Sequence, residues 1–155
     1  MNETKETQAA SLEVCASRPY LVHGSTQPPS VVAIGYARCS TEEQSVESMA
    51  IDYQIKRLEE VCGVGNVVRD EKSATKCPLL KRGRFWEAIE RLRALPRGVE
   101  RRLIYTRIDR LARTMGDGET ITSLCKEGIV FQGLDSGEVM QGAQGTMMLN
   151  MGLMM

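Results

Sequence analysis

The chain has 155 residues, 42% of them hydrophobic, so it is long enough to form one globular domain with a substantial core. Basic and acidic residues number 20 each, and the formal net charge of zero argues against a generally basic coat for nucleic acid. No apolar stretch approaches the roughly 20 residues that a membrane-spanning helix needs.

The cysteines and the histidine indicate neither a disulfide framework nor a metal site. Five cysteines are scattered without a CxxC pair, and the one histidine, His23, stands in a region rich in proline and serine. The first residues are of mixed charge and show no secretory signal. We therefore expect a cytoplasmic protein, away from the membrane, that uses no metal and no cofactor.

Residues 1–30 have the composition of a leader. The stretch ends in Ser25-Thr26-Gln27-Pro28-Pro29-Ser30, and nothing before it shows sustained periodicity. We expect a disordered leader here, followed by a single folded domain over residues 31–144.

From residue 31 onward, short apolar runs alternate with stretches of helical periodicity. A possible helix cap at Thr41 precedes the first helical stretch, and Gly63 and Gly65 follow it. We expect strands at 31–38, 67–70, 102–106 and 129–131, and helices at about 41–62, 82–95 and 117–126. This alternation predicts an α/β fold with a mostly parallel sheet of four to five strands flanked by helices.

Polar side chains gather where the predicted strands end. In a parallel sheet, the carboxyl ends of the strands meet at one edge, where ligands commonly bind. The loop with Arg82 is expected to lean over the same edge. The residues predicted to share this edge are Arg38, Ser40, Asp70, Ser73, Arg82, Asp109, Arg110 and Arg113.

Several arginines around one serine favour phosphate chemistry. A guanidinium is a planar fork that matches phosphate oxygens, and fixed positive groups stabilise the charge that develops on an attacked phosphorus. A serine beside such groups is a candidate nucleophile toward a phosphodiester, although no conventional base is evident in the sequence.

These residues, in this order, resemble a known family. The motifs Tyr36-x-Arg38-x-Ser40, Arg82-x-x-Phe85 and Asp109-Arg110-Leu111-x-Arg113 look like those of the N-terminal catalytic domain of serine recombinases, the resolvase/invertase family. The resemblance covers about residues 31–155. The separation between Gln44 and Gln54 is more like that of the large serine recombinases, which include phage integrases and transposases.

The resemblance implies a site-specific DNA recombinase. Ser40 would attack a DNA phosphate and form a 5′-phosphoserine intermediate, and strand exchange would need neither ATP nor a metal. By motif position Arg38, Arg82, Arg110 and Arg113 would hold the scissile phosphate, while Asp109 would orient an arginine or assist the leaving hydroxyl. The supporting positions would be Tyr36, Gln44, Gln54, Asp70 and Ser73. The implied partner is double-stranded DNA, gripped by its phosphate backbone, with a homodimer or tetramer of the full-length protein at the nucleoid.

The methionine-rich stretch 145–155 resembles only the beginning of the long helix with which family members dimerise and cross DNA. A truncated helix is therefore expected, and with it an alternative function. In that alternative the chain is a truncated or inactive relative that acts as an interaction or dimerisation module.

Each candidate residue also has a structural interpretation. Ser40 is at a position where serine often caps a helix, Asp70 and Ser73 are common turn residues, and arginines often lie on solvated surfaces. An unrelated flavodoxin-like phosphate-binding domain is a third hypothesis, but the sequence has no GxGxxG or GxxxxGK[ST] loop.

Overall fold

The computed structural model describes residues 31–38, 44–71 and 77–142, with the side chains of 44–50 excepted. The predicted leader 1–30, the predicted terminal helix 145–155 and the candidate residues Ser40 and Ser73 lie outside the described residues.

Five strands form one sheet in the order β2-β1-β3-β4-β5. Their bounds are β1 Val31–Arg38, β2 Val67–Asp70, β3 Glu100–Tyr105, β4 Ile129–Gly133 and β5 Val139–Met140. The first four strands pair in parallel, and β5 pairs antiparallel with β4. The predicted α/β fold with a mostly parallel sheet is therefore confirmed, and β1 is a central strand with neighbours on both sides.

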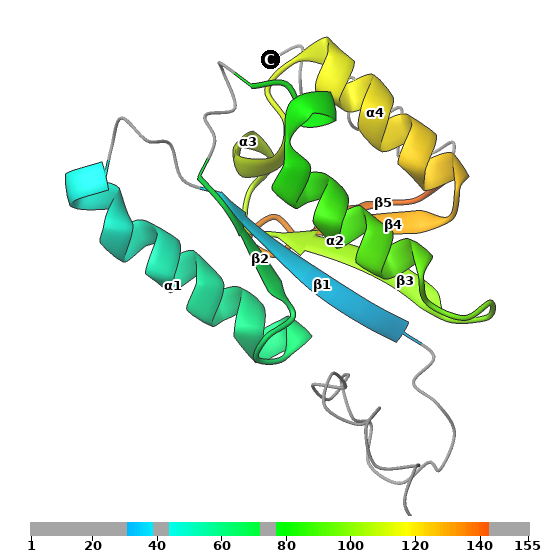
Figure 1. Cartoon of the computed structure of the whole chain (residues 1–155), viewed down its shortest axis with the longest axis horizontal. Coiled ribbons are helices and arrows are strands. Elements are labelled where there is room, and N and C mark those ends of the chain that lie inside the picture. The colour runs from blue at the N-terminus through cyan, green and yellow to red at the C-terminus, as the bar shows by residue number, and fades with distance from the viewer. Residues whose placement is uncertain (1–30, 39–43, 72–76, 143–155) are drawn as a thin grey trace, which may run out of the picture.

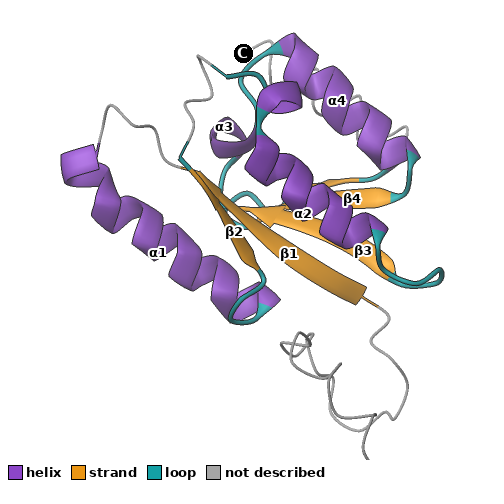
Figure 2. Cartoon of the chain, viewed as in Figure 1, coloured by secondary structure: helices purple, strands orange, loops and turns teal. Residues whose placement is uncertain are grey.

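Helices cover both faces of this sheet (Figures 1 and 2). Helix α1 lies on one face, α2 and α4 lie on the other, and the short α3 lies beside the end of β1. Their bounds are α1 Gln44–Cys62, α2 Gly83–Arg93, α3 Ile108–Leu111 and α4 Met115–Lys126, with a 3-10 turn η2 at Leu79–Lys81. Within the described residues, no helix has both the length and the apolar content that a bilayer crossing requires.

Strand β3 begins earlier than predicted, because the prediction followed an apolar pattern and the first residues of this strand are charged. Glu100, Arg101 and Arg102 break the apolar pattern, yet each pairs in register with a residue of β1. The side chains of this polar stretch find partners of their own, since Arg102 donates from Nη1 to Gln132 Oε1 at 2.8 Å and pairs with Glu100. Backbone pairing with a central strand therefore extended β3 beyond its hydrophobic run.

Three short elements, η2, α3 and β5, were not predicted. Each has only two to four residues, too few to show a hydrophobic period. Helix α4 also begins two residues earlier than expected, because Thr114 caps it. The Thr114 hydroxyl accepts from the Asp117 amide at 3.2 Å, and the Asp117 carboxylate accepts from the Thr114 amide at 3.3 Å.

The core has two parts, one on each face of the sheet, because successive strand residues point to opposite sides. Ile34 and Tyr36 of β1 belong to the larger part, beneath α2 and α4, whereas Ala37 packs with residues of α1 on the other face. By the same alternation Arg38 points to the side of Tyr36. Strand β1 therefore directs both a tyrosine and an arginine toward the α2 and α4 side.

Candidate active site

Four elements converge at the carboxyl edge of the sheet. Arg38 is the last residue of β1, in register with Asp70 at the end of β2. Arg82 is the N-cap of α2, Arg110 lies in α3, and Arg113 follows that helix. The fold brings these four arginines to one edge from separate parts of the sequence, as the strand-end argument predicted.

Arg38 is almost completely buried, with 1% of its surface exposed. Its Nε donates to the carbonyl oxygen of Arg110 at 2.9 Å, and its Nη2 donates to that of Asp109 at 3.4 Å. These bonds fix the Arg38 side chain against the backbone of α3. The guanidinium of Arg38 is therefore held in one orientation by residues 71 and 72 positions farther along the chain.

The backbone of Arg38 is held as well. Gln54 of α1 is buried, and its Nε2 donates to the Arg38 carbonyl oxygen at 3.5 Å. The Thr106 hydroxyl, just after β3, donates to Gln54 Oε1 at 3.4 Å. Gln54, predicted as a supporting residue, thus links the ends of two neighbouring strands.

Arg82 is fully buried, with 0% exposure. Its Nε donates to the Cys77 carbonyl oxygen at 2.8 Å, and its Nη1 donates to that of Leu111 at 2.9 Å. Its Nη2 is buried and has no hydrogen-bond partner within the described part of the chain. A buried donor left unpaired is costly, so it marks a place where a ligand acceptor would be stabilising.

Arg110 and Arg113 complete the cluster at its more open side. Arg113 is exposed, and its Nε donates to the Asp109 carbonyl oxygen at 3.2 Å. Burial and the positive charges of Arg82, Arg113 and Arg110 lower the pKa of Arg38. An arginine stays protonated even so, which means that four like charges repel one another at this edge.

Asp109 takes part mainly through its backbone. Its carbonyl oxygen accepts hydrogen bonds from both Arg38 and Arg113. Its carboxylate accepts from Arg107 Nε at 3.1 Å. The orienting role predicted for Asp109 therefore fits its carbonyl oxygen, whereas its side chain pairs with a different arginine.

Tyr36 and Asp70 form a buried pair beneath the cluster. The Tyr36 hydroxyl donates to Asp70 Oδ2 at 2.6 Å, and both side chains are buried. Burial, and then the negative charge of Asp70, raise the pKa of Tyr36 above its ordinary value, against a smaller opposite effect of Arg82. The phenol therefore stays protonated and ties the ends of β1 and β2 together.

Three predicted residues cannot be placed by their side chains. Ser40 and Ser73 lie outside the described residues, and Gln44 begins α1 with its side chain outside the description. In the described segments, no group of three histidine, cysteine, aspartate or glutamate side chains could hold a metal ion.

The comparison with known families decides the assignment. A family model described as the N-terminal domain of resolvase matches residues 33–155. The chain belongs to the resolvase family. It is thus the domain of an enzyme that recombines DNA, as the order of its motifs predicted.

A solved structure shares the fold of this resolvase domain. The N-terminal catalytic domain of TP901-1 integrase superposes with a TM-score of 0.54 at 23% sequence identity, covering 78% of this chain and 90% of that one. At this identity the likeness shows the fold, and the assignment to the integrase type stays a prediction. Among curated proteins, none matches the chain.

Two polar residues of the resolvase domain were missed in the sequence. The sequence pattern predicts Thr106 only as the end of a strand, yet it is buried and its hydroxyl donates to Gln54. The same pattern predicts Asp117 as the start of a helix, yet it is 1% exposed and accepts from three backbone amides. The spacing Thr114-x-x-Asp117, that of a capping box, was the one signal that pointed to Asp117.

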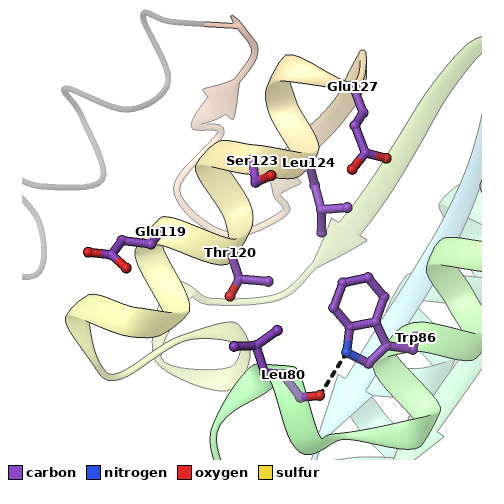
Figure 3. Close-up of a pocket in the computed structure, with 7 residues that line it drawn as sticks. All are labelled: Leu80, Trp86, Glu119, Thr120, Ser123, Leu124 and Glu127. Atoms are coloured by element: carbon purple, nitrogen blue, oxygen red, sulfur yellow. Dashed lines mark hydrogen bonds between the residues drawn. The ribbon is translucent and has the colours of Figure 1, made fainter.

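A shallow pocket of about 270 Å³ lies between α4 and the η2–α2 segment (Figure 3). The indole of Trp86 forms part of its wall and donates to the Leu80 carbonyl oxygen at 3.1 Å. The carboxylate of Glu127, also at this pocket, pairs with Arg93. The pocket includes none of the four clustered arginines, so it is separate from the candidate active site.

Proposed function

We propose that this resolvase domain cleaves and rejoins double-stranded DNA through a covalent link between Ser40 and a backbone phosphate. The observation that carries the proposal is the arginine cluster, with Arg38 and Arg82 buried and a buried Nη2 of Arg82 without a described partner. Backbone carbonyl oxygens orient these two guanidiniums. A bound phosphate would offset the repulsion among the cations.

In the proposed step, the Ser40 oxygen forms a bond to phosphorus, and the bond from phosphorus to the 3′ oxygen breaks. The serine gives up its proton, and the 3′ oxygen leaves as a hydroxyl. The 5′ end stays attached as a phosphoserine. Because one phosphate ester replaces another, the bond energy is kept, and a 3′-hydroxyl can reverse the step without ATP.

The arginines would act by stabilising the transition state. Negative charge grows on the phosphate oxygens as the serine attacks, and preorganised donors stabilise it without further rearrangement. Arg38 and Arg82 are held by carbonyl oxygens at 2.8–2.9 Å, so their geometry is set before DNA binds. We assign Arg110 and Arg113 to the more open side of the same phosphate.

The remaining predicted residues receive supporting roles in this proposal. Asp109 would orient Arg38 and Arg113 through its carbonyl oxygen. Tyr36 with Asp70 would hold the ends of β1 and β2 together, and Gln54 would hold the ends of β1 and β3. Gln44 and Ser73 keep the supporting roles that the motif implies. The reaction joins two DNA duplexes, so we propose that the protein acts as a homodimer or tetramer on DNA, at the nucleoid in the cytoplasm.

Covalent trapping tests this proposal. The whole chain, fused to a sequence-specific DNA-binding domain, is mixed with duplexes in which two binding sites flank a varied central sequence. We expect a protein–DNA adduct in a denaturing gel that Ser40→Ala abolishes. Ser123→Ala, which changes an exposed serine of α4, serves as the matched control and should leave the adduct unchanged. Absence of an adduct, or its persistence in Ser40→Ala, would refute the assigned nucleophile.

A further inference from the structure

The carboxylate of Asp117 lies between the two segments that carry the active-site arginines. The residue is on the first turn of α4 and is 1% exposed. Its Oδ1 accepts from the Leu79 amide at 2.7 Å, and its Oδ2 accepts from the amides of Arg113 at 3.1 Å and Thr114 at 3.3 Å. One buried side chain therefore receives three backbone donors from two parts of the chain.

Helix capping explains only part of this arrangement. The reciprocal bonds between Thr114 and Asp117 close the N-terminus of α4 and involve neighbours in sequence. The bond from Leu79 joins residues 38 positions apart and satisfies no donor of α4. The shortest of the three bonds is thus a tertiary link that the cap does not need.

The hydrogen bond from Leu79 to Asp117 is connected to Arg82 by a single turn of the backbone. Leu79 begins η2, and its carbonyl oxygen accepts from the Arg82 amide at 3.1 Å. Arg82 in turn reaches the Leu111 carbonyl oxygen through Nη1, two residues before Arg113. Asp117 and Arg82 therefore join the same two segments at two points, and the carboxylate fixes the distance between the backbones of Arg82 and Arg113.

We propose that Asp117 is a positioning residue of the recombination site, which holds Arg82 and Arg113 in register for a shared phosphate. The inference rests on the proposed function, because it assigns these arginines to one phosphate. Only a carboxylate offers two acceptor oxygens here. An asparagine has the same shape but would direct its NH₂ group at a backbone donor.

The test compares Asp117→Asn with Thr114→Ala in the DNA-binding fusion of the whole chain. Thr114→Ala removes the helix cap and leaves the carboxylate for Leu79, so it reports the effect of capping alone. Both variants are assayed at the same temperature interval below their own Tm. At saturating DNA we expect Asp117→Asn to lower the rate of adduct formation by about tenfold or more, with unchanged DNA affinity and with Thr114→Ala near wild type.

A second readout does not depend on activity. The ¹H–¹⁵N resonance of Arg82 Nε should be shifted and protected from exchange in the wild type, because this group donates to the Cys77 carbonyl oxygen. We expect the resonance to move toward the position of a free arginine in Asp117→Asn and to stay in place in Thr114→Ala. If Asp117→Asn does not fold, Asp117→Glu replaces it in both measurements, because glutamate keeps the charge but displaces the carboxylate.

The outcomes separate the two proposals. If the wild type forms no adduct, the proposed function fails, and the Arg82 resonance alone decides the role of Asp117. If the wild type forms the adduct, either an unchanged rate or an unmoved Arg82 resonance in Asp117→Asn overturns the positioning role. An equal loss of rate in Thr114→Ala would reduce that role to helix capping.

Discussion

At the scale of the residue, Arg82 is the most informative side chain of the candidate site. It is fully buried, two of its nitrogens meet backbone carbonyl oxygens, and the third has no partner among the described residues. Burying a guanidinium is costly, and the carbonyl bonds return only part of that cost. A fold optimised for stability alone would place an apolar side chain there, so we attribute this arginine to phosphate binding.

Replacing Arg82 by lysine should therefore impair catalysis strongly. Lysine keeps the charge but cannot reach both carbonyl oxygens and still present a third donor. We expect Arg82→Lys to lower the rate of adduct formation by about 10²–10³-fold, as when one preorganised donor is lost. The measurement is the single-turnover rate in the DNA-binding fusion, with circular dichroism to confirm folding.

The control for Arg82 lies two residues away. Arg84 is exposed and pairs with Glu87 at 2.7 Å, so Arg84→Lys makes the same chemical change on the surface. Its rate should stay close to that of the wild type, since exposed ion pairs contribute little. Equal rates for the two lysine variants would remove Arg82 from the mechanism.

At the scale of the element, Gly35 sets the distance between β1 and α1. A Cβ at this position would lie 3.0 Å from Leu58 Cβ and 3.0 Å from a methyl carbon of Val67. The same helix carries Gln54, which holds the carbonyl of Arg38. Close packing of α1 against Gly35 thus also sets how far Gln54 lies from the sheet.

We expect Gly35→Ala to push α1 away from the sheet. Overpacking of this kind typically costs about 1–3 kcal/mol of unfolding free energy. Gly83→Ala is the matched control, because no atom lies within 4 Å of the added Cβ at this first residue of α2, and alanine favours helix. Urea unfolding should show a loss for Gly35→Ala and no loss for Gly83→Ala. A neutral Gly35→Ala would mean that α1 can shift freely on the sheet.

At the scale of the whole molecule, several protonated acids are buried in the two parts of the core. Burial raises the pKa of Cys62 to about 12 and that of Cys125 to about 11. Burial also raises the pKa values of Tyr36 and Tyr105, which donate to Asp70 and Glu138 respectively. All four groups keep their protons in the folded state after the unfolded chain has lost them.

The stability of the molecule should therefore fall at alkaline pH. Since each folded pKa lies above its unfolded value, the stabilising contribution of each group is complete below the unfolded pKa and is lost as the pH rises from there through the folded pKa. The free energy of unfolding begins to fall near pH 9, where the thiols ionise in the unfolded chain, and falls more steeply near pH 10, where the phenols do. Each group contributes a slope of up to about 1.4 kcal/mol per pH unit.

Urea unfolding between about pH 7 and pH 11 measures this dependence. Tyr36→Phe should reduce the slope above about pH 10, and Cys62→Ala should reduce it from about pH 9. A free energy of unfolding that stays constant up to pH 11 would show that these groups ionise in the folded protein.

Local patterns in the sequence were enough to predict the alternating strands and helices and the kind of side chains at the candidate site. Apolar runs and helical periods predicted the positions of β1, β2 and α1, because their interior faces must be apolar over several residues. The strand-end rule then predicted that Arg38, Arg110 and Arg113 would meet, since it needs only the order of parallel strands. The ordered motifs led to the resolvase family.

The way in which those arginines are held depends on contacts between distant parts of the fold. The pairing of β5 with β4, the burial of Arg82 and the bond from Leu79 to Asp117 all join residues far apart in sequence, or elements too short to have a period. Which nitrogen meets which carbonyl depends on the packing of α3 and η2 against the sheet edge. A linear pattern can show that a charged group is present, but only the folded backbone fixes the direction of its hydrogen bonds.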